Sequence, residues 1–170
     1  MKYGAIKKTD IANGEGVRVS LFVSGCNNRC PGCFNPETWS FDYGFEFDRG
    51  VMAQLIEDLR PDYISGLSVL GGEPLDPLNA ERVCYLCDTV KLIYPAKSIW
   101  IYTGYTYEAV KDLDVMRYID ILVDGRFIEE RKDISLQFRG SSNQRIIDVQ
   151  ETRRSGSITL WRSKYEKVRV

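Results

Sequence analysis

The regular alternation of apolar, strand-like segments with helix-like segments is the feature that most constrains how this chain folds. The strand-like segments are rich in β-branched and aliphatic side chains and cover residues 17–25, 63–72, 98–104 and 119–125. Strands that alternate with helices pair in parallel, because each helix carries the chain back along one face of the sheet. The sequence therefore predicts an α/β protein with a mostly parallel sheet.

Two long helices are expected between the first three strands. Residues 50–60 place apolar side chains on one helical face, and Pro61 follows as a stop. Asp76 and Pro77 are typical of an N-cap and a first helical residue, so the second helix should continue from there to about residue 94.

Shorter elements are expected toward the C-terminus. Thr106 is expected to cap a short helix that ends near Tyr118. Residues 136–149 predict a strand, a turn and a second strand, and residues 157–170 alternate as in a last strand. The length of 170 residues suggests a single domain.

Charge and composition narrow the partners and the compartment. A net charge of −1 provides no electrostatic case for binding nucleic acid or an anionic membrane. No apolar run is long enough for a transmembrane helix, and the first residues lack the apolar segment of a signal peptide. Five cysteines without a secretion signal indicate a reducing compartment, so we expect a cytoplasmic protein.

The chain contains no histidine. This excludes zinc sites that need imidazole, catalytic triads built on histidine, and histidine general bases. Any chemistry must come from thiolates, carboxylates, backbone groups or a cofactor.

Three cysteines, Cys26, Cys30 and Cys33, are spaced C-x3-C-x2-C directly after the first strand. Packing of three thiols as small apolar groups is one interpretation. A zinc site is a second, with a fourth ligand from Cys84, Cys87 or a carboxylate. A [4Fe–4S] cluster held by three cysteines is the third, and it leaves one iron open to a substrate.

Glycine-containing turns follow three of the strands, at Gly25, Gly71-Gly72 and Gly104. Ligands of parallel α/β proteins gather at the carboxyl ends of the strands. The cysteines and the "GGEP" turn at residues 71–74 should therefore lie on one rim of the sheet.

The cysteine spacing, followed by the aromatic Phe34, resembles the signature of the radical S-adenosylmethionine enzymes. The resemblance implies that S-adenosylmethionine chelates the open iron and that Phe34 lies near its adenine. It also implies that the backbone of Gly71, Gly72 and Glu73 holds the methionine amino group, with further cofactor contacts from Gly32 and Cys33.

A narrower resemblance covers residues 10–148 and includes "DIANGEGVRVSLFVSGCNNRCPGCFNPETW", "LGGEPLDPLN", "IWIYTGYTYE", "ILVDGRF" and "LQFRGSSNQRIID". These segments are similar to the activating proteins of anaerobic (class III) ribonucleoside-triphosphate reductases. The resemblance implies an incomplete (β/α) barrel, with residues 1–150 as the activase domain and residues 151–170 as an extension without an assigned role.

The reaction implied by this family begins with one-electron reduction of S-adenosylmethionine at the cluster. The 5′-deoxyadenosyl radical that results removes a hydrogen atom from one glycine of the reductase large subunit. The implied partners are that subunit and an electron donor such as flavodoxin.

Two strand ends supply further candidates. Thr103 and Asp124 are either turn residues or contacts to the ribose or methionine part of S-adenosylmethionine, as the resemblance implies. The polar stretch at residues 139–145 is either a hairpin turn or a further contact to ligand or partner. Cys84 and Cys87 fall on a predicted helix, where packing is favoured over a metal or redox role.

Three rival functions remain open on the sequence. They are a pyruvate formate-lyase type of activase, a radical enzyme acting on a small molecule, and a non-catalytic iron–sulfur electron carrier. The short chain argues against a closed small-molecule pocket, and the "GGEP" turn argues against a carrier, which needs no cradle for an amino group.

Overall fold

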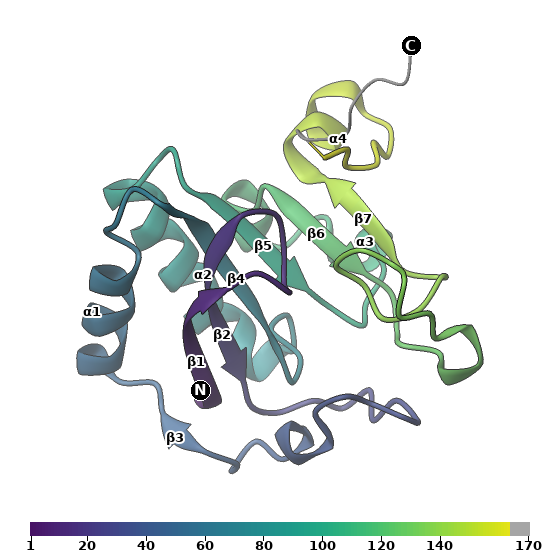
Figure 1. The fold of residues 1–170 in the computed structure, drawn as a ribbon, viewed down its shortest axis with the longest axis horizontal. Helices are drawn as coiled ribbons and strands as arrows, with labels where there is room; N and C mark the ends of the chain where they lie inside the picture. Colours follow the sequence, from purple (N-terminus) through teal and green to yellow (C-terminus); the bar gives the residue numbers. More distant parts are fainter. Residues whose placement is uncertain (164–170) are drawn as a thin grey trace.

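The computed structural model describes residues 1–163, which form one open, seven-stranded sheet with helices packed against it (Figure 1). The strands are β1 (Lys2–Asp10), β2 (Val17–Val23), β3 (Phe45–Glu46), β4 (Ile64–Gly71), β5 (Ser98–Tyr102), β6 (Ile121–Asp124) and β7 (Arg145–Asp148). The α-helices are α1 (Arg49–Asp58), α2 (Pro77–Ile93), α3 (Tyr107–Val110) and α4 (Val149–Ser155). Short 3-10 turns are η1 (Pro36–Trp39), η2 (Asp114–Arg117) and η3 (Glu129–Arg131).

The strand order is β3-β1-β2-β4-β5-β6-β7. The central strands β2, β4, β5 and β6 are parallel, whereas β1, β3 and β7 pair antiparallel at the two sides. The α/β class and the parallel centre predicted from the sequence are confirmed. The sheet does not close on itself, because β3 and β7 form its two edges.

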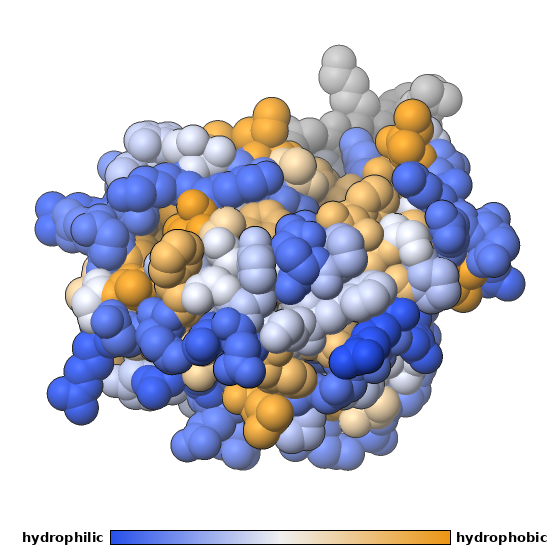
Figure 2. Space-filling view, turned by 90° about the horizontal axis from the view of Figure 1, so that it is seen from below, coloured by the Kyte–Doolittle hydropathy of each residue, from blue (hydrophilic) through white to orange (hydrophobic). Residues whose placement is uncertain are grey.

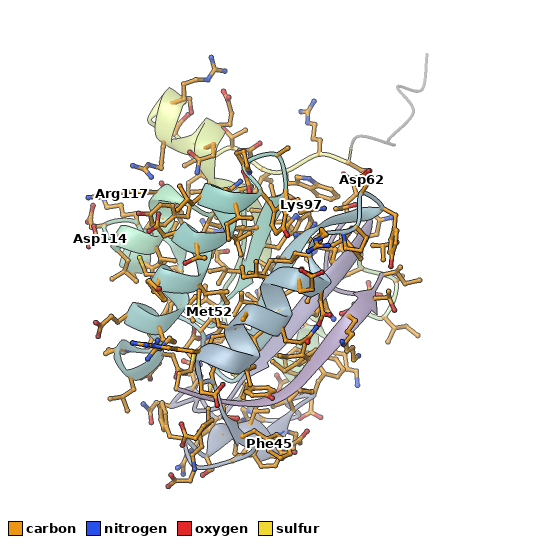
Figure 3. All side chains as sticks on the ribbon, turned by 90° about the vertical axis from the view of Figure 1, so that its left-hand side faces the viewer. Phe45, Met52, Asp62, Lys97, Asp114 and Arg117 are labelled. Carbon is orange, nitrogen blue, oxygen red and sulfur yellow. The ribbon has the colours of Figure 1, made fainter. Side chains whose placement is uncertain are left out.

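One face of the sheet carries the main hydrophobic core. Side chains such as Leu21, Val69 and Ile101 point to this face and are fully buried beneath α1 and α2. Figure 3 shows the two helices beside each other over the sheet, with Met52 of α1 in the contact. The aliphatic strands can be buried in this way because helices cover the face along most of their length.

The other face carries an unusual buried cation. Arg18 is 1% exposed, and its guanidinium donates to Ser68 Oγ at 2.7 Å and to the carbonyls of Leu67 and Ser98, both at 2.8 Å. The guanidinium carbon also lies 5.4 Å from the centre of the Trp100 ring. Burial lowers the pKa of Arg18 to about 10.

The segment after α4 returns to this second face. Trp161 packs edge-on against Trp100 and Phe138, with ring centres 5.2 and 5.8 Å away. Its backbone N–H donates to the Ile146 carbonyl at 2.8 Å, and Leu160 forms a single bridge with Ile147 of β7. These contacts fill the amino-terminal end of the face and leave its carboxyl end open.

Several element predictions need correction. The expected strand-turn-strand at 136–149 forms only β7, because residues 136–144 fold as a loop held by the Gln144 side chain, which accepts from the backbone N–H groups of Gly140 and Ser141. The expected helix after Thr106 divides into α3 and η2, and the Thr106 side chain makes no capping bond. A last strand was predicted over residues 157–170. Residues 157–163 form only the single bridge between Leu160 and Ile147, and residues 164–170 lie outside the described residues.

The two long helices were predicted well. Asp76 caps α2 by accepting from the Leu78 N–H at 3.0 Å, as its place before Pro77 indicates. Within residues 1–163, none of the helices has the length and apolar character needed to cross a membrane.

Candidate metal centre and ligand cavity

A cavity of about 440 Å³ lies at the carboxyl ends of the parallel strands. Its walls come from the cysteine loop (residues 24–35), the ends of β4 and β5, the β6–β7 segment (residues 125–144), and single residues of β1, β2, the β1–β2 turn and η1. Of the residues predicted to form the site, it is lined by Cys26, Cys30, Cys33, Phe34, Gly71, Gly72, Glu73 and Thr103. The volume is within the range of cavities that hold small molecules.

The cysteine loop is fixed at its start by backbone hydrogen bonds to η1. Gly25 N–H donates to the Thr38 carbonyl at 2.8 Å, and Cys26 N–H donates to the Trp39 carbonyl at 3.0 Å. Gly25 has φ +96, and a side chain there would collide with the Phe41 ring. The turn therefore needs glycine for its conformation and for its close packing.

The three cysteines of this loop face the same cavity as free thiols. Cys26 and Cys30 are buried and Cys33 is half-buried. Burial raises the pKa of the Cys26 thiol. Metal or cluster binding at this position therefore requires displacement of a firmly held proton.

The donor set of this loop fits a four-iron cluster better than a single ion. Within residues 1–163, no three cysteine or acidic side chains surround one point closely enough to hold a single metal ion. A zinc ion would draw its sulfur ligands to about 2.3 Å, whereas cysteines that hold a cluster are spread over its separate irons. Three thiols on one cavity wall match the second requirement.

Glu73 organises the site through four hydrogen bonds. Its carboxylate is 1% exposed and accepts from Thr103 Oγ1 at 2.7 Å, Gly104 N–H at 2.7 Å, Leu75 N–H at 3.1 Å and Asn28 Nδ2 at 2.9 Å. These donors belong to three different segments: the cysteine loop, the turn after β4 and the turn after β5. Burial raises the pKa of Glu73, while the donors act in the opposite direction by favouring its charged form.

The glycines before Glu73 allow two loops to touch. Gly72 N–H donates to the Val23 carbonyl and Glu73 N–H to the Gly25 carbonyl, both at 2.7 Å. A Cβ on Gly72 would lie 2.5 Å from the Gly25 carbonyl oxygen. A side chain at position 72 would therefore collide with the cysteine loop itself.

Thr103 and Asp124 have different positions. Thr103 lines the cavity, and its hydroxyl is bound to Glu73. Asp124 is 1% exposed and is not among the lining residues, because its carboxylate accepts from Tyr107 N–H at 2.7 Å and from the Arg145 guanidinium. The expected contact of Asp124 with the ligand stays a prediction.

Phe34 lies at the mouth of the cavity, where 60% of its surface is exposed. Its ring centre is 5.1 Å from that of Phe127, and Lys132 Nζ is 5.1 Å from the Phe34 ring centre. Gly32 is exposed outside the lining, and a Cβ there would lie 2.6 Å from the Glu129 carboxyl carbon. Gly32 thus permits close packing of the cysteine loop against Glu129, and its expected cofactor contact stays a prediction.

The structure adds lining residues that the sequence analysis missed, among them Asn28, Trp39, Tyr102 and Phe127. Tyr102 had a usable signal, since it is the last residue of its strand and follows the alternation of Trp100 toward the second face. Of the stretch at 139–145, Arg139, Gly140 and Gln144 line the cavity.

Cys84 and Cys87 lie on α2, away from the cavity. Cys87 is fully buried in the main core and Cys84 packs against it, so the packing interpretation is confirmed. Neither residue is placed to complete a zinc site with the three loop cysteines.

Comparison with known proteins first defines the class. Residues 12–147 match the family model described as a 4Fe-4S single cluster domain. The chain is 45% identical over 148 residues to the anaerobic ribonucleoside-triphosphate reductase-activating protein of Haemophilus influenzae, with 85% of this chain and 96% of that protein covered.

Two further relatives carry the same name. The protein of Enterobacteria phage T4 is 40% identical over 86% of this chain and 93% of its own length. That of Escherichia coli K12 is 41% identical over 85% of this chain and 96% of its own length. The chain therefore belongs to the family of anaerobic ribonucleoside-triphosphate reductase-activating proteins, as its motifs predicted.

Proposed function

We propose that this chain is an activating enzyme that cleaves S-adenosylmethionine reductively and generates a glycyl radical on an anaerobic ribonucleoside-triphosphate reductase. The observation that carries the proposal is the convergence of Cys26, Cys30, Cys33 and the Glu73 turn on one cavity. When bound, a reduced [4Fe–4S] cluster supplies one electron to the sulfonium, which breaks to methionine and a 5′-deoxyadenosyl radical.

The three cysteines hold the cluster in this proposal, and the turn after β4 holds the methionine amino group. An ammonium group only donates hydrogen bonds. The N–H groups of Gly72 and Glu73 already donate to Val23 and Gly25. The acceptors must therefore be carbonyl groups of the turn, which Glu73 holds in place through its side chain.

Phe34 and Phe127 suit an adenine ring, since two aromatic rings tilted by 59° at the cavity mouth offer apolar faces and edges for a flat ring to pack against. Thr103 remains a proposed ligand contact through the atoms it presents to the cavity. The open sheet corresponds, in this proposal, to the incomplete barrel of the radical S-adenosylmethionine enzymes.

The proposed partners are the reductase large subunit and an electron donor such as flavodoxin, in the cytoplasm. The names of the relatives support the first partner. The proposed activase domain covers residues 1–150, with residues 151–170 as an extension. The family model ends at residue 147, near this boundary, although α4 crosses it.

The test combines spectroscopy with product analysis. Anaerobically reconstituted protein, dithionite and S-adenosylmethionine should yield 5′-deoxyadenosine, and addition of the cognate reductase should yield a glycyl doublet in electron paramagnetic resonance. Cys30→Ala should lose the cluster absorbance and both products, while Cys84→Ala, on the far side of the sheet, should retain all three. An electron carrier would produce neither 5′-deoxyadenosine nor the doublet.

A further inference from the structure

Two buried hydrogen-bond donors on the cavity wall have no partner among residues 1–163. They are the hydroxyl of Tyr102, at the end of β5, and the indole N–H of Trp39, at the end of η1. Buried polar groups are almost always paired, and an unpaired donor destabilises the folded state. Both residues line the same cavity, so a ligand bound there is the available source of the acceptors that the described residues do not supply.

The wall around Tyr102 is mostly apolar, and charges of both signs lie near it: Lys7 and Arg18 are positive and Asp10 is negative. Phe22 and Leu70, which are register partners on β2 and β4, line it together with Phe138. Lys7 also lines the cavity, with its Nζ 5.2 Å from the Phe22 ring centre. Burial raises the pKa of the Tyr102 phenol, so the hydroxyl remains a donor, and the nearby positive charge of Arg18 acts against this rise.

This wall suits a neutral acceptor better than the charged ends of S-adenosylmethionine. The charged groups of S-adenosylmethionine, a positive sulfonium and an anionic carboxylate, would find no unbalanced partner here, because Lys7 lies near Asp10, whose carboxylate already accepts from Ala12 N–H and Asn13 Nδ2. A peptide carbonyl is neutral and accepts from O–H and N–H donors. A glycine-containing segment also presents its backbone without a side chain between it and the wall.

We propose that the Tyr102 hydroxyl and the Trp39 indole N–H donate to backbone carbonyls of the reductase segment that carries the radical-forming glycine. The inference rests on the proposed function and adds to it the residues that hold the substrate peptide. Tyr102 and Trp39 would position the glycine for hydrogen abstraction, while the cysteine loop and the Glu73 turn serve the cluster and S-adenosylmethionine.

The experiment compares Tyr102→Phe and Trp39→Phe with Tyr63→Phe, a control on an exposed tyrosine outside the cavity. Four quantities are measured: iron content, melting temperature, 5′-deoxyadenosine formed with dithionite alone, and the rate of glycyl radical formation on the cognate reductase. Tyr102→Phe removes one unpaired oxygen, so the iron content and the 5′-deoxyadenosine formed without the reductase should be unchanged. The melting temperature should be unchanged or slightly raised.

The rate of glycyl radical formation should fall about three- to tenfold in Tyr102→Phe, the effect of one neutral hydrogen bond, and in the same direction in Trp39→Phe. Loss of partner-free cleavage in Tyr102→Phe would assign the hydroxyl to S-adenosylmethionine and overturn the inference. A lowered melting temperature, or a radical rate equal to that of Tyr63→Phe, would overturn it as well. The wild type is measured first. If it cleaves S-adenosylmethionine but never forms the glycyl radical doublet on the reductase, the proposed function itself fails, and the variants are not compared.

Discussion

Glu73 explains at the scale of one residue why the "GGEP" turn contains an acid. The glycines permit the backbone of this turn to approach Gly25, and the carboxylate then binds donors from both neighbouring loops. An acid accepts at both oxygens, and here each oxygen receives two hydrogen bonds. The carboxylate thus shapes the site, whatever its ligand.

Glu73→Gln should therefore be destabilising despite its similar size. Either orientation of the amide would direct its NH2 group at two donors, so at least one buried donor loses its acceptor. We expect a loss of about 1–3 kcal/mol in the free energy of unfolding and weaker binding of S-adenosylmethionine, measured by urea unfolding and calorimetry. Glu81→Gln, on the exposed face of α2, is the matched control. Equal stability of the two variants would show that the Glu73 network does not hold the loops.

The sequence predicted those site residues whose role depends on their own strand or turn. The cysteine triad, Glu73 and Thr103 all directly follow parallel strands, so topology alone brings them to one cavity. The surroundings of Gly32 and Asp124 could not be predicted in this way. Glu129 fills the space beside Gly32, and Arg145 donates to the Asp124 carboxylate. Such partners come from distant segments and leave no local pattern.

The same distinction holds at the scale of elements. The four parallel strands were predictable since they are largely buried on both faces and consist mostly of apolar and β-branched residues. Strand β1 was missed because it is half-exposed and contains Lys7 and Lys8, and β3 has only two residues. The loop at 136–144 has strand-like residues, but Phe138 has φ +55 and turns the chain toward Trp100.

The segment after α4 is an element whose role only the structure indicates. Trp161 completes an aromatic cluster with Trp100 and Phe138, and Phe138 also lines the cavity. Trp161 thus supports the wall of the site from behind.

Trp161→Ala should loosen this wall. Removing a half-buried indole is expected to cost about 2 kcal/mol in the free energy of unfolding, measured by urea denaturation, and to increase hydrogen exchange in the 136–140 loop. Leu160→Ala is the control, because 57% of that residue is exposed and its loss should change stability by less than about 0.5 kcal/mol. Unchanged exchange in the loop of Trp161→Ala would contradict a supporting role.

At the scale of the whole molecule, the two faces of the open sheet have separate tasks. The helices cover one face and bury the main core, and the other face is filled at one end and hollow at the end that carries the cysteines. Figure 2, which views the molecule from below, shows apolar residues in separate patches among hydrophilic ones. An open sheet must also secure its edges, and at β7 this depends on charge.

Arg145 provides that attachment by joining three elements. Its guanidinium contacts Asp124 at the end of β6 and Glu108 of α3, the latter at 2.9 Å. The hydrogen bonds from Arg145 lower the pKa of Glu108 to about 2. Asp124 is fully buried, and its carboxylate is paired with Arg145 and accepts from Tyr107 N–H.

Arg145→Ala should therefore lower the free energy of unfolding by about 3 kcal/mol, because a buried carboxylate loses its counter-charge. Arg154→Ala, which removes an exposed pair with Glu151, should cost less than about 0.5 kcal/mol. The pKa of Glu108 is lowered from its ordinary value of 4.5, so the charged Glu108 stabilises the folded state above pH 4.5. This stabilisation is lost as the pH falls toward about 2. Urea unfolding from pH 7 to pH 2.5 should thus show the gap between wild type and Arg145→Ala narrowing below pH 4.5. A gap no larger than that of Arg154→Ala at pH 7 would show that β7 is held by its backbone pairing with β6 alone.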